Sequence, residues 1–150
     1  MEGISVMDPK VIKTNMQANN KEDALNQLAT LLKEAGYISS IEGYLKDVYE
    51  REEEGMTGIG NFIAIPHGKS QHVNEIGVAI GTLNEEISWE TLDGKGVKGI
   101  VLFAVGNDSE GANQHLKLLS LFARKLGNDD VVSSLLNAKN TSEVINAFEI

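Results

Sequence analysis

A short segment near the middle of the chain, Thr57 to Gly68 (TGIGNFIAIPHG), constrains the fold more than any other feature. Its apolar run, Ile63 to Ile65, is bounded by turn residues and predicts a strand that is covered on both faces. Pro66 favours extended geometry at the residue before it and has no N–H for a ladder bond, so we expect strand pairing to stop there. His67 would then lie at the mouth of the strand, and Gly68 would let another backbone, a partner or a ligand approach closely.

The rest of the chain alternates between strand and helix patterns, with caps where helices should begin and end. We expect a strand at 10–16, followed by a helix that is capped by Asn20 and ends at Gly36, with the apolar stripe Leu25, Leu28, Leu32 and Ala35. A second helix should run from Ser40 through Arg51 to Gly55. Strands should follow at 62–65, 76–80 and 97–105, and helices from about Gly111 onward. This order predicts an α/β fold, a three-layer α/β/α sandwich around a mixed β-sheet. A chain of 150 residues fits one domain, 1–150.

Composition excludes several classes of protein. The chain has no cysteine, so disulfide frameworks and thiolate metal sites are ruled out. No stretch approaches the roughly 20 apolar residues of a membrane span, and the N-terminus lacks the apolar core of a signal peptide, so we expect a cytoplasmic protein without membrane insertion. The net charge of −9 argues against nucleic-acid binding.

Two further patterns lead to no cofactor or metal site. The glycine-rich Thr57 to Gly60 lacks the lysine of a P-loop and does not run from strand into helix in dinucleotide order, so a tight turn before the next strand explains it. The Thr57 hydroxyl could still reach a bound phosphate. The spacing of His67 and His72 does not suit two ligands on one helical face, and we interpret His72 as a surface histidine.

Two polar residues besides His67 could contact an anion. Arg51 lies among four glutamates and could simply relieve acidic repulsion at a solvated helix end, yet a guanidinium can also chelate phosphate through two parallel bonds. His115 opens an apolar run and could be a polar residue at a buried helix edge. If Asn113 is the N-cap, His115 falls in the first helical turn, where the helix favours neutral imidazole and anions.

The segment Ala64-Ile65-Pro66-His67-Gly68 resembles the phosphorylation site of the enzyme IIA domains of the fructose and mannitol type in the bacterial sugar phosphotransferase system. The resemblance covers nearly the whole chain and continues in Arg51-Glu52, Thr57-Gly58-Ile59-Gly60, Gly68-Lys69-Ser70, Trp89, Leu92-Asp93-Gly94, the apolar strand 100–105, His115-Leu116 and Leu118-Leu119. It implies that His67 is the phosphohistidine, that Arg51 stabilises the phosphate and that His115 supports it with a hydrogen bond. The details are most similar to the fructose subgroup, although Phe62 stands where a small residue is expected.

The resemblance implies a phosphotransferase that needs no cofactor and no metal. It would take a phosphoryl group from the histidine-containing phosphocarrier protein and pass it to an enzyme IIB for uptake of a sugar of the fructose type. The alternative is a regulatory protein of the nitrogen-related branch, which acts through phosphorylation-dependent binding to other proteins. A metal-dependent hydrolase that uses the three histidines is a third and weaker hypothesis.

Overall fold

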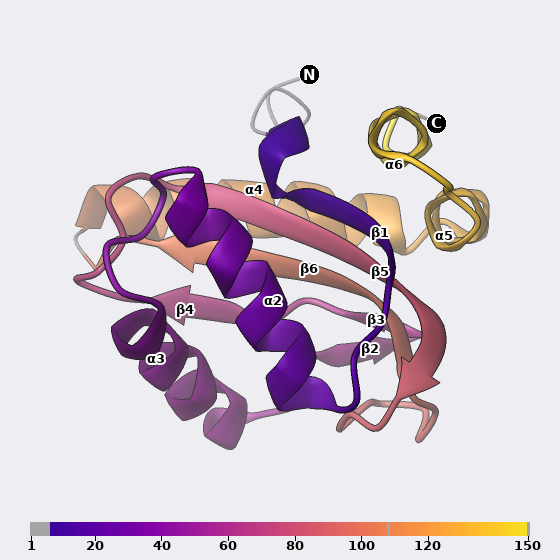
Figure 1. The fold of residues 1–150 in the computed structure, drawn as a ribbon, viewed down its shortest axis with the longest axis horizontal. Helices are drawn as coiled ribbons and strands as arrows, with labels where there is room; N and C mark the ends of the chain where they lie inside the picture. Colours follow the sequence, from indigo (N-terminus) through magenta and orange to yellow (C-terminus); the bar gives the residue numbers. More distant parts are fainter. Residues whose placement is uncertain (1–6, 108, 150) are drawn as a thin grey trace.

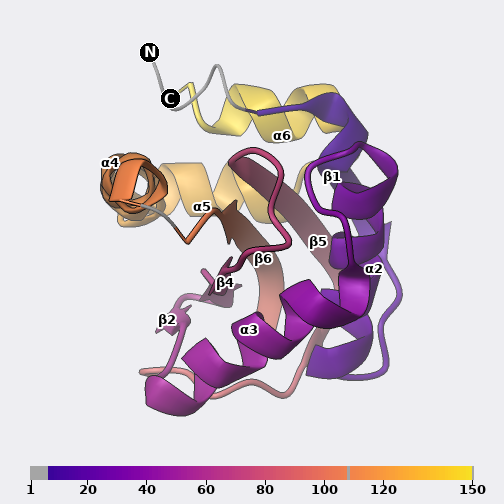
Figure 2. The ribbon, with the colours of Figure 1, turned by 90° about the vertical axis from the view of Figure 1, so that its left-hand side faces the viewer.

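The computed structural model describes residues 7 to 107 and 109 to 149, and this part of the chain forms a six-stranded mixed sheet between two layers of helices (Figures 1 and 2). The strands are β1 (Ile12–Met16), β2 (Gly58–Gly60), β3 (Ile63–Ala64), β4 (His67–Lys69), β5 (Gly77–Ile87) and β6 (Val97–Val105). The helices are the 3-10 helix η1 (Pro9–Val11), α2 (Lys21–Glu34), α3 (Ile41–Glu54), α4 (Ser109–Leu126), α5 (Asp129–Leu136) and α6 (Thr141–Ala147). The predicted three-layer α/β architecture is confirmed.

The central strand β6 organises the sheet, whose order is β1-β5-β6-β3-β2. It pairs antiparallel with β5 along one edge, and along the other edge it pairs in parallel first with β3 and then with β4. Pairing therefore does not stop at Pro66, as the sequence had suggested. Pro66 does interrupt the strand, but its carbonyl still accepts a hydrogen bond from the Phe103 N–H at 3.0 Å, and the ladder resumes at His67.

Each face of the sheet has its own helices and its own core (Figure 2). Helices α2 and α3 cover one face, and α4, α5 and α6 cover the other. The first core contains fully buried leucines of α2 together with Tyr44 and Val48 of α3. On the second face, Phe122 of α4 packs edge to face on Phe103 of β6, with the ring centroids 5.5 Å apart. Both layers are thus anchored on the strand that pairs with β4.

The first two long helices begin where the sequence predicted. The side chains of Asn20 and Ser40 accept hydrogen bonds from the backbone N–H groups of Asp23 and Gly43, and both residues are N-caps. Helix α4 differs, because it begins at Ser109 and Asn113 lies inside it. Acidic residues are favoured in the first turn of a helix, and the sequence places Glu110 there, upstream of the expected cap.

The strands differ more from the predictions. The expected first strand begins at Ile12, because Asp8 caps a short 3-10 helix over residues 9–11. The glycine-rich segment expected to be a turn forms β2, which pairs antiparallel with β3 at the sheet edge. The turn itself falls on Asn61 and Phe62, which have φ values of 55° and 68°. Strand β5 also continues past the predicted end to Ile87, because its ladder with β6 resumes at Ile87 and Val97 after an irregularity that follows Thr82.

Candidate active site

His67 is the first residue of β4 and is half-buried beside the end of α3. Its backbone lies opposite Phe103 in the parallel ladder with β6. The strand therefore fixes the backbone of His67 on both sides, through Pro66 before it and the ladder after it. Such a position suits a reacting group that must be held in one geometry.

Gly68 brings α3 unusually close to this strand. A Cβ atom at Gly68 would lie 2.6 Å from Cγ2 of Val48 and 2.8 Å from Cε1 of Tyr44, closer than carbon atoms pack. The Tyr44 hydroxyl also donates a hydrogen bond to the Phe103 carbonyl at 2.6 Å. The close approach expected from this glycine is thus made by side chains of α3, the helix that carries Arg51.

Arg51 contacts His67 directly. Its Nε donates a hydrogen bond to Nε2 of His67 at 3.0 Å, and its Nη1 donates to the Gly55 carbonyl at 3.4 Å. The two residues are 16 positions apart in the chain and belong to different elements, α3 and β4. Arg51 is therefore part of the His67 site, and does more than balance the neighbouring glutamates.

The surroundings favour neutral imidazole. Burial lowers the pKa of His67 below its ordinary value, and the Arg51 guanidinium lowers this pKa further, while a hydrogen bond with the Ile65 backbone partly opposes both effects. In the neutral ring the proton belongs on Nδ1, because Nε2 accepts the hydrogen bond from Arg51. Nε2 therefore carries the lone pair, and it faces a planar cation.

Thr57 lies beside the site but has other partners. Its buried hydroxyl donates to Oε2 of Glu52 at 2.6 Å and accepts from Nε1 of Trp89 at 3.3 Å. A contact between Thr57 and a bound phosphate, as suggested from the sequence, would have to replace the bond to Glu52. This role stays a prediction.

His115 lies in the second turn of α4, not in the first turn as the expected Asn113 cap implied. His115 therefore lies beyond the first helical turn, where the helix N-terminus has its main effect on anions and on imidazole. The side chain of His115 is outside the part of the chain that the structure describes, so its hydrogen bond to His67 stays a prediction. Helix α4 packs on β6, the strand that also pairs with β4.

His72 lies apart from Arg51, over the start of α3. It is half-buried, and a Cβ atom at Gly43 would meet its ring, so it packs against the helix instead of standing free on the surface. Among residues 7–107 and 109–149, no three histidines or carboxylates are grouped closely enough to hold a metal ion. No helix in the same described ranges is long and apolar enough to cross a membrane.

Comparison with known proteins shows which family the chain belongs to. Residues 5–149 match the family described as phosphoenolpyruvate-dependent sugar phosphotransferase system, EIIA 2. The chain belongs to this EIIA family. The mannitol-specific phosphotransferase enzyme IIA component of Bacillus subtilis is 30% identical over 148 residues, covering 97% of each chain. The fructose-specific EIIA component of Haloferax volcanii is 33% identical over 142 residues, covering 94% of this chain and 91% of the relative.

Other EIIA relatives are much longer or have known structures. The chain spans 20% of the length of the Escherichia coli 2-O-alpha-mannosyl-D-glycerate-specific EIIABC component, with 32% identity over 135 residues. It spans 22% of the fructose-specific EIIABC component of Bacillus subtilis. The crystal structure of nitrogen regulatory protein IIA-Ntr from Neisseria meningitidis superimposes with a TM-score of 0.87 over 99% of both chains at 26% identity. An Escherichia coli complex of the mannitol IIA and phosphorylated IIB enzymes matches in fold, with a TM-score of 0.79 and 21% identity over 95% of this chain and 96% of that one.

The sequence pointed to His67 and Arg51, which the fold brings into contact, but not to the residues around Thr57. Glu52 stands in a run of glutamates that look alike in sequence, and Lys21 follows a helix cap without any motif. Lys21 reaches Glu52 from a distant part of the chain, and Glu52 in turn bonds Thr57, five positions further on. The one local signal was Trp89, a large residue that needs a hydrogen-bond partner when it is buried.

Proposed function

We propose that this EIIA chain is a cytoplasmic phosphocarrier whose reacting atom is Nε2 of His67. The observation that carries the proposal is the 3.0 Å contact between this nitrogen and Arg51 Nε. It places a lone pair and a planar cation together, which are the groups that an incoming phosphoryl group requires.

The transfer needs no further reactant. The lone pair on Nε2 attacks the phosphorus of a phosphohistidine donor, the donor N–P bond breaks, and the new N–P bond forms on His67. The proton on Nδ1 stays in place during the transfer. Before this attack Arg51 leaves the ring nitrogen, which frees the Nε2 lone pair, and turns to the phosphoryl oxygens, where its charge stabilises a transition state in which the protein mainly supplies position and positive charge.

We propose the histidine-containing phosphocarrier protein as the donor and an enzyme IIB as the acceptor. The related mannitol IIA fold occurs in a complex with phosphorylated IIB. His115 would add a hydrogen bond to the phosphate, and Thr57 would be a weaker phosphate contact. We propose a sugar of the fructose type, as the sequence motifs suggest, and both fructose-specific and mannitol-specific EIIA components are among the relatives, at 33% and 30% identity.

The test is phosphorylation of purified protein by the general phosphocarrier, comparing wild type with His67→Ala. Wild type should carry an acid-labile, base-stable phosphate and the variant should carry none. Phosphate remaining on His67→Ala at the wild-type level would overturn the assignment. Circular dichroism of the variant controls for folding.

A regulatory role is the second candidate, supported by the similarity to the Neisseria IIA-Ntr protein at 26% identity. The acceptor of the phosphate distinguishes the two roles. Rapid loss of phosphate to catalytic amounts of an enzyme IIB supports sugar transport. A phosphate that stays on the protein, together with partner binding that depends on it, supports regulation.

A further inference from the structure

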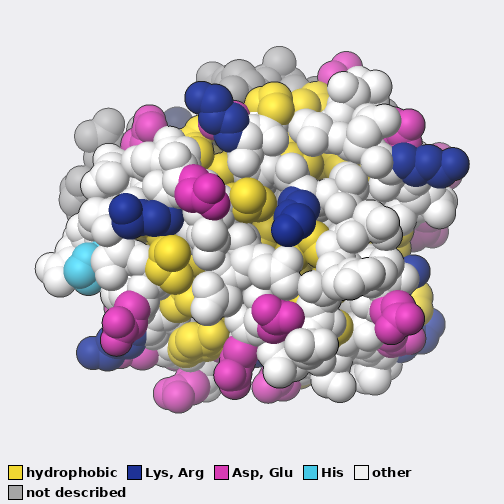
Figure 3. Space-filling model, in the orientation of Figure 1, with side chains coloured by type: hydrophobic (Ala, Val, Ile, Leu, Met, Phe, Trp, Pro, Cys, Tyr) yellow, Lys and Arg dark blue, Asp and Glu magenta, His cyan; other side chains and the backbone are white. Residues whose placement is uncertain are grey.

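The helical turn that carries Arg51 is poorly stabilised by its own sequence. Glu52 to Glu54 place three negative charges at the C-terminus of α3, where the helix dipole disfavours them. The C-cap, Gly55, is extended at φ 171° and ψ 163°, so the helix ends without the left-handed glycine cap that satisfies its last carbonyls. Acidic side chains gather along the lower edge of this face of the molecule (Figure 3). The turn therefore depends on side-chain contacts to hold its place.

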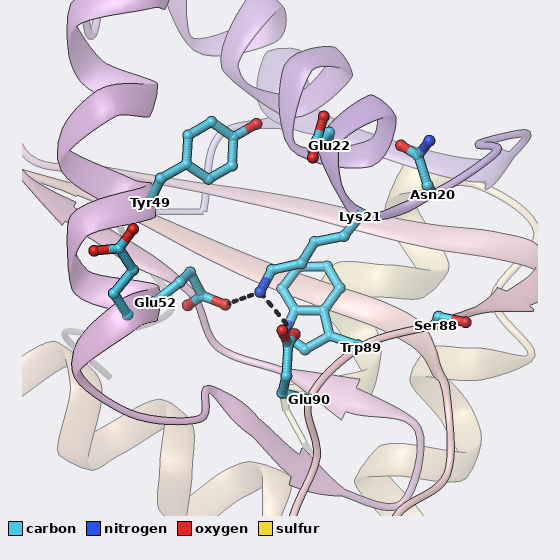
Figure 4. A pocket seen from close by; sticks show the side chains of 9 residues that line it. Asn20, Lys21, Glu22, Tyr49, Glu52, Ser88, Trp89 and Glu90 are labelled. Carbon is cyan, nitrogen blue, oxygen red and sulfur yellow. Dashed lines mark hydrogen bonds and ion pairs between the residues drawn. The ribbon is translucent and has the colours of Figure 1, made fainter.

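Glu52 makes those contacts. Its side chain is only 7% exposed and forms an ion pair with Nζ of Lys21 at 2.6 Å (Figure 4). It also accepts the hydrogen bond from the Thr57 hydroxyl at 2.6 Å. The neighbouring Glu53 and Glu54 are exposed. One carboxylate of the run is thus turned into the protein, while the next two face solvent.

Lys21 is itself firmly held. Its ammonium group lies 4.8 Å from the centroid of the Trp89 ring and pairs with Glu90 at 2.9 Å. Burial works to lower the pKa of Lys21, but the hydrogen bonds to Glu52 and Glu90 outweigh it, so the pKa is raised and the group stays charged. The end of α3 is therefore fastened to the start of α2 by a charged pair.

Thr57 connects the same carboxylate to the strand of His67. Its carbonyl accepts a hydrogen bond from the Ile65 N–H at 2.9 Å, two residues before His67. Its hydroxyl reaches Glu52 and receives the Trp89 indole N–H. The helix that supplies Arg51 and the segment that supplies His67 thus meet at one residue.

We propose that Glu52 is a positioning residue: held between Lys21 and Thr57, it fixes the last turn of α3 so that Arg51 stays in contact with His67. Its effect on phosphoryl transfer rests on the proposed function, whereas its effect on geometry does not. The first test therefore measures whether Arg51 keeps its contact with His67, and the second measures the rate of phosphoryl transfer.

The geometric test is the pKa of His67, measured by NMR titration of its ring protons in the unphosphorylated protein. Removing the Glu52 charge would by itself lower this pKa, because a nearby anion favours imidazolium. Releasing Arg51 would raise it. We expect Glu52→Ala to raise the pKa of His67 toward the value in Arg51→Ala, and the matched variant Glu54→Ala not to raise it.

Thr57→Val is the second variant, because it removes the hydroxyl at nearly constant volume and without a change of formal charge. Thr57→Val should raise the pKa of His67 as well. If Glu52→Ala does not fold, the pKa of His67 in Thr57→Val alone tests whether Glu52 holds Arg51 in place. An unchanged or lowered pKa in the folded Glu52 and Thr57 variants would overturn the proposal. So would an equal rise in Glu54→Ala.

The kinetic test is the transfer rate from the phosphocarrier. We expect Glu52→Ala to lose about 10- to 100-fold, since a displacement of about 1 Å at a reacting site has effects of this size. Adding Glu52→Ala to Arg51→Ala should slow the transfer little further, because both substitutions act through the same contact between Arg51 and His67. If the pKa of His67 rises as expected while wild-type His67 accepts no phosphate, the positioning role stands and the proposed function fails.

Discussion

The substitution Gly68→Ala should separate α3 from the strand of His67. The added Cβ would lie 2.6 Å from Cγ2 of Val48, whereas carbon atoms pack at about 3.5 Å or more. If β4 stays in its ladder, α3 must retreat by about 1 Å. The hydrogen bond from Arg51 to His67 is 3.0 Å long and would stretch to about 4 Å, beyond hydrogen-bond distance.

Two measurements follow from this geometry. Overpacking should lower the free energy of unfolding by about 1–3 kcal/mol, measured by urea denaturation. Transfer to His67 should slow by about 100-fold, since the donor of a positioned hydrogen bond is displaced. Gly127→Ala is the matched control, because a Cβ there would meet its nearest atoms at an ordinary 3.5 Å. Wild-type stability and rate in Gly68→Ala would refute the close packing of α3 on β4.

Three other predictions use the same assays. Arg51→Lys keeps the charge but loses the planar fork, so it should fold normally and lose most of the transfer rate; a wild-type rate would leave Arg51 as a simple counter-charge. The folded protein lowers the pKa of His67, so the unfolded state binds more protons just below the reference value near 6.5. The stability of wild type relative to His67→Gln should therefore fall as the pH drops from about 7 and level off below the folded-state pKa; a flat difference would contradict the lowered pKa. Phe62→Gly should raise the free energy of unfolding by about 0.5–1 kcal/mol, because it relieves a φ of 68° at a bulky residue, and a loss of stability in urea would mean that the ring's packing outweighs the strain.

The helices of the first layer could be predicted because their signals are local. Asn20 and Ser40 cap helices whose apolar stripes begin at once, and each cap acts on N–H groups within three residues. The predicted start of α4 was wrong, because Asn113 is an acceptable N-cap residue but lies inside the observed helix. Local preference could not decide between two possible starts a few residues apart.

The strands and the site were predictable only in part. The sequence indicated that His67 follows a buried strand and Pro66, but not that pairing resumes, because that depends on β6 far along the chain. Arg51 was a candidate by chemistry, and only the fold brought it to Nε2 of His67. Glu52 could not be told from Glu53 or Glu54, since burial and not composition distinguishes them.

The dependence of β3 and β4 on β6 also bears on the order in which the protein assembles. These strands have two and three residues, too few to persist alone, and both find their parallel partner only in a segment made later, Val97–Val105. Helices α2 and α3 can form from local contacts, but the ladder under His67 requires closure of a long loop. We therefore expect a nascent chain that ends before Val97 to contain helical structure and no site at all. The ability to accept phosphate would then appear late in synthesis, only after β3 and β4 have paired with β6.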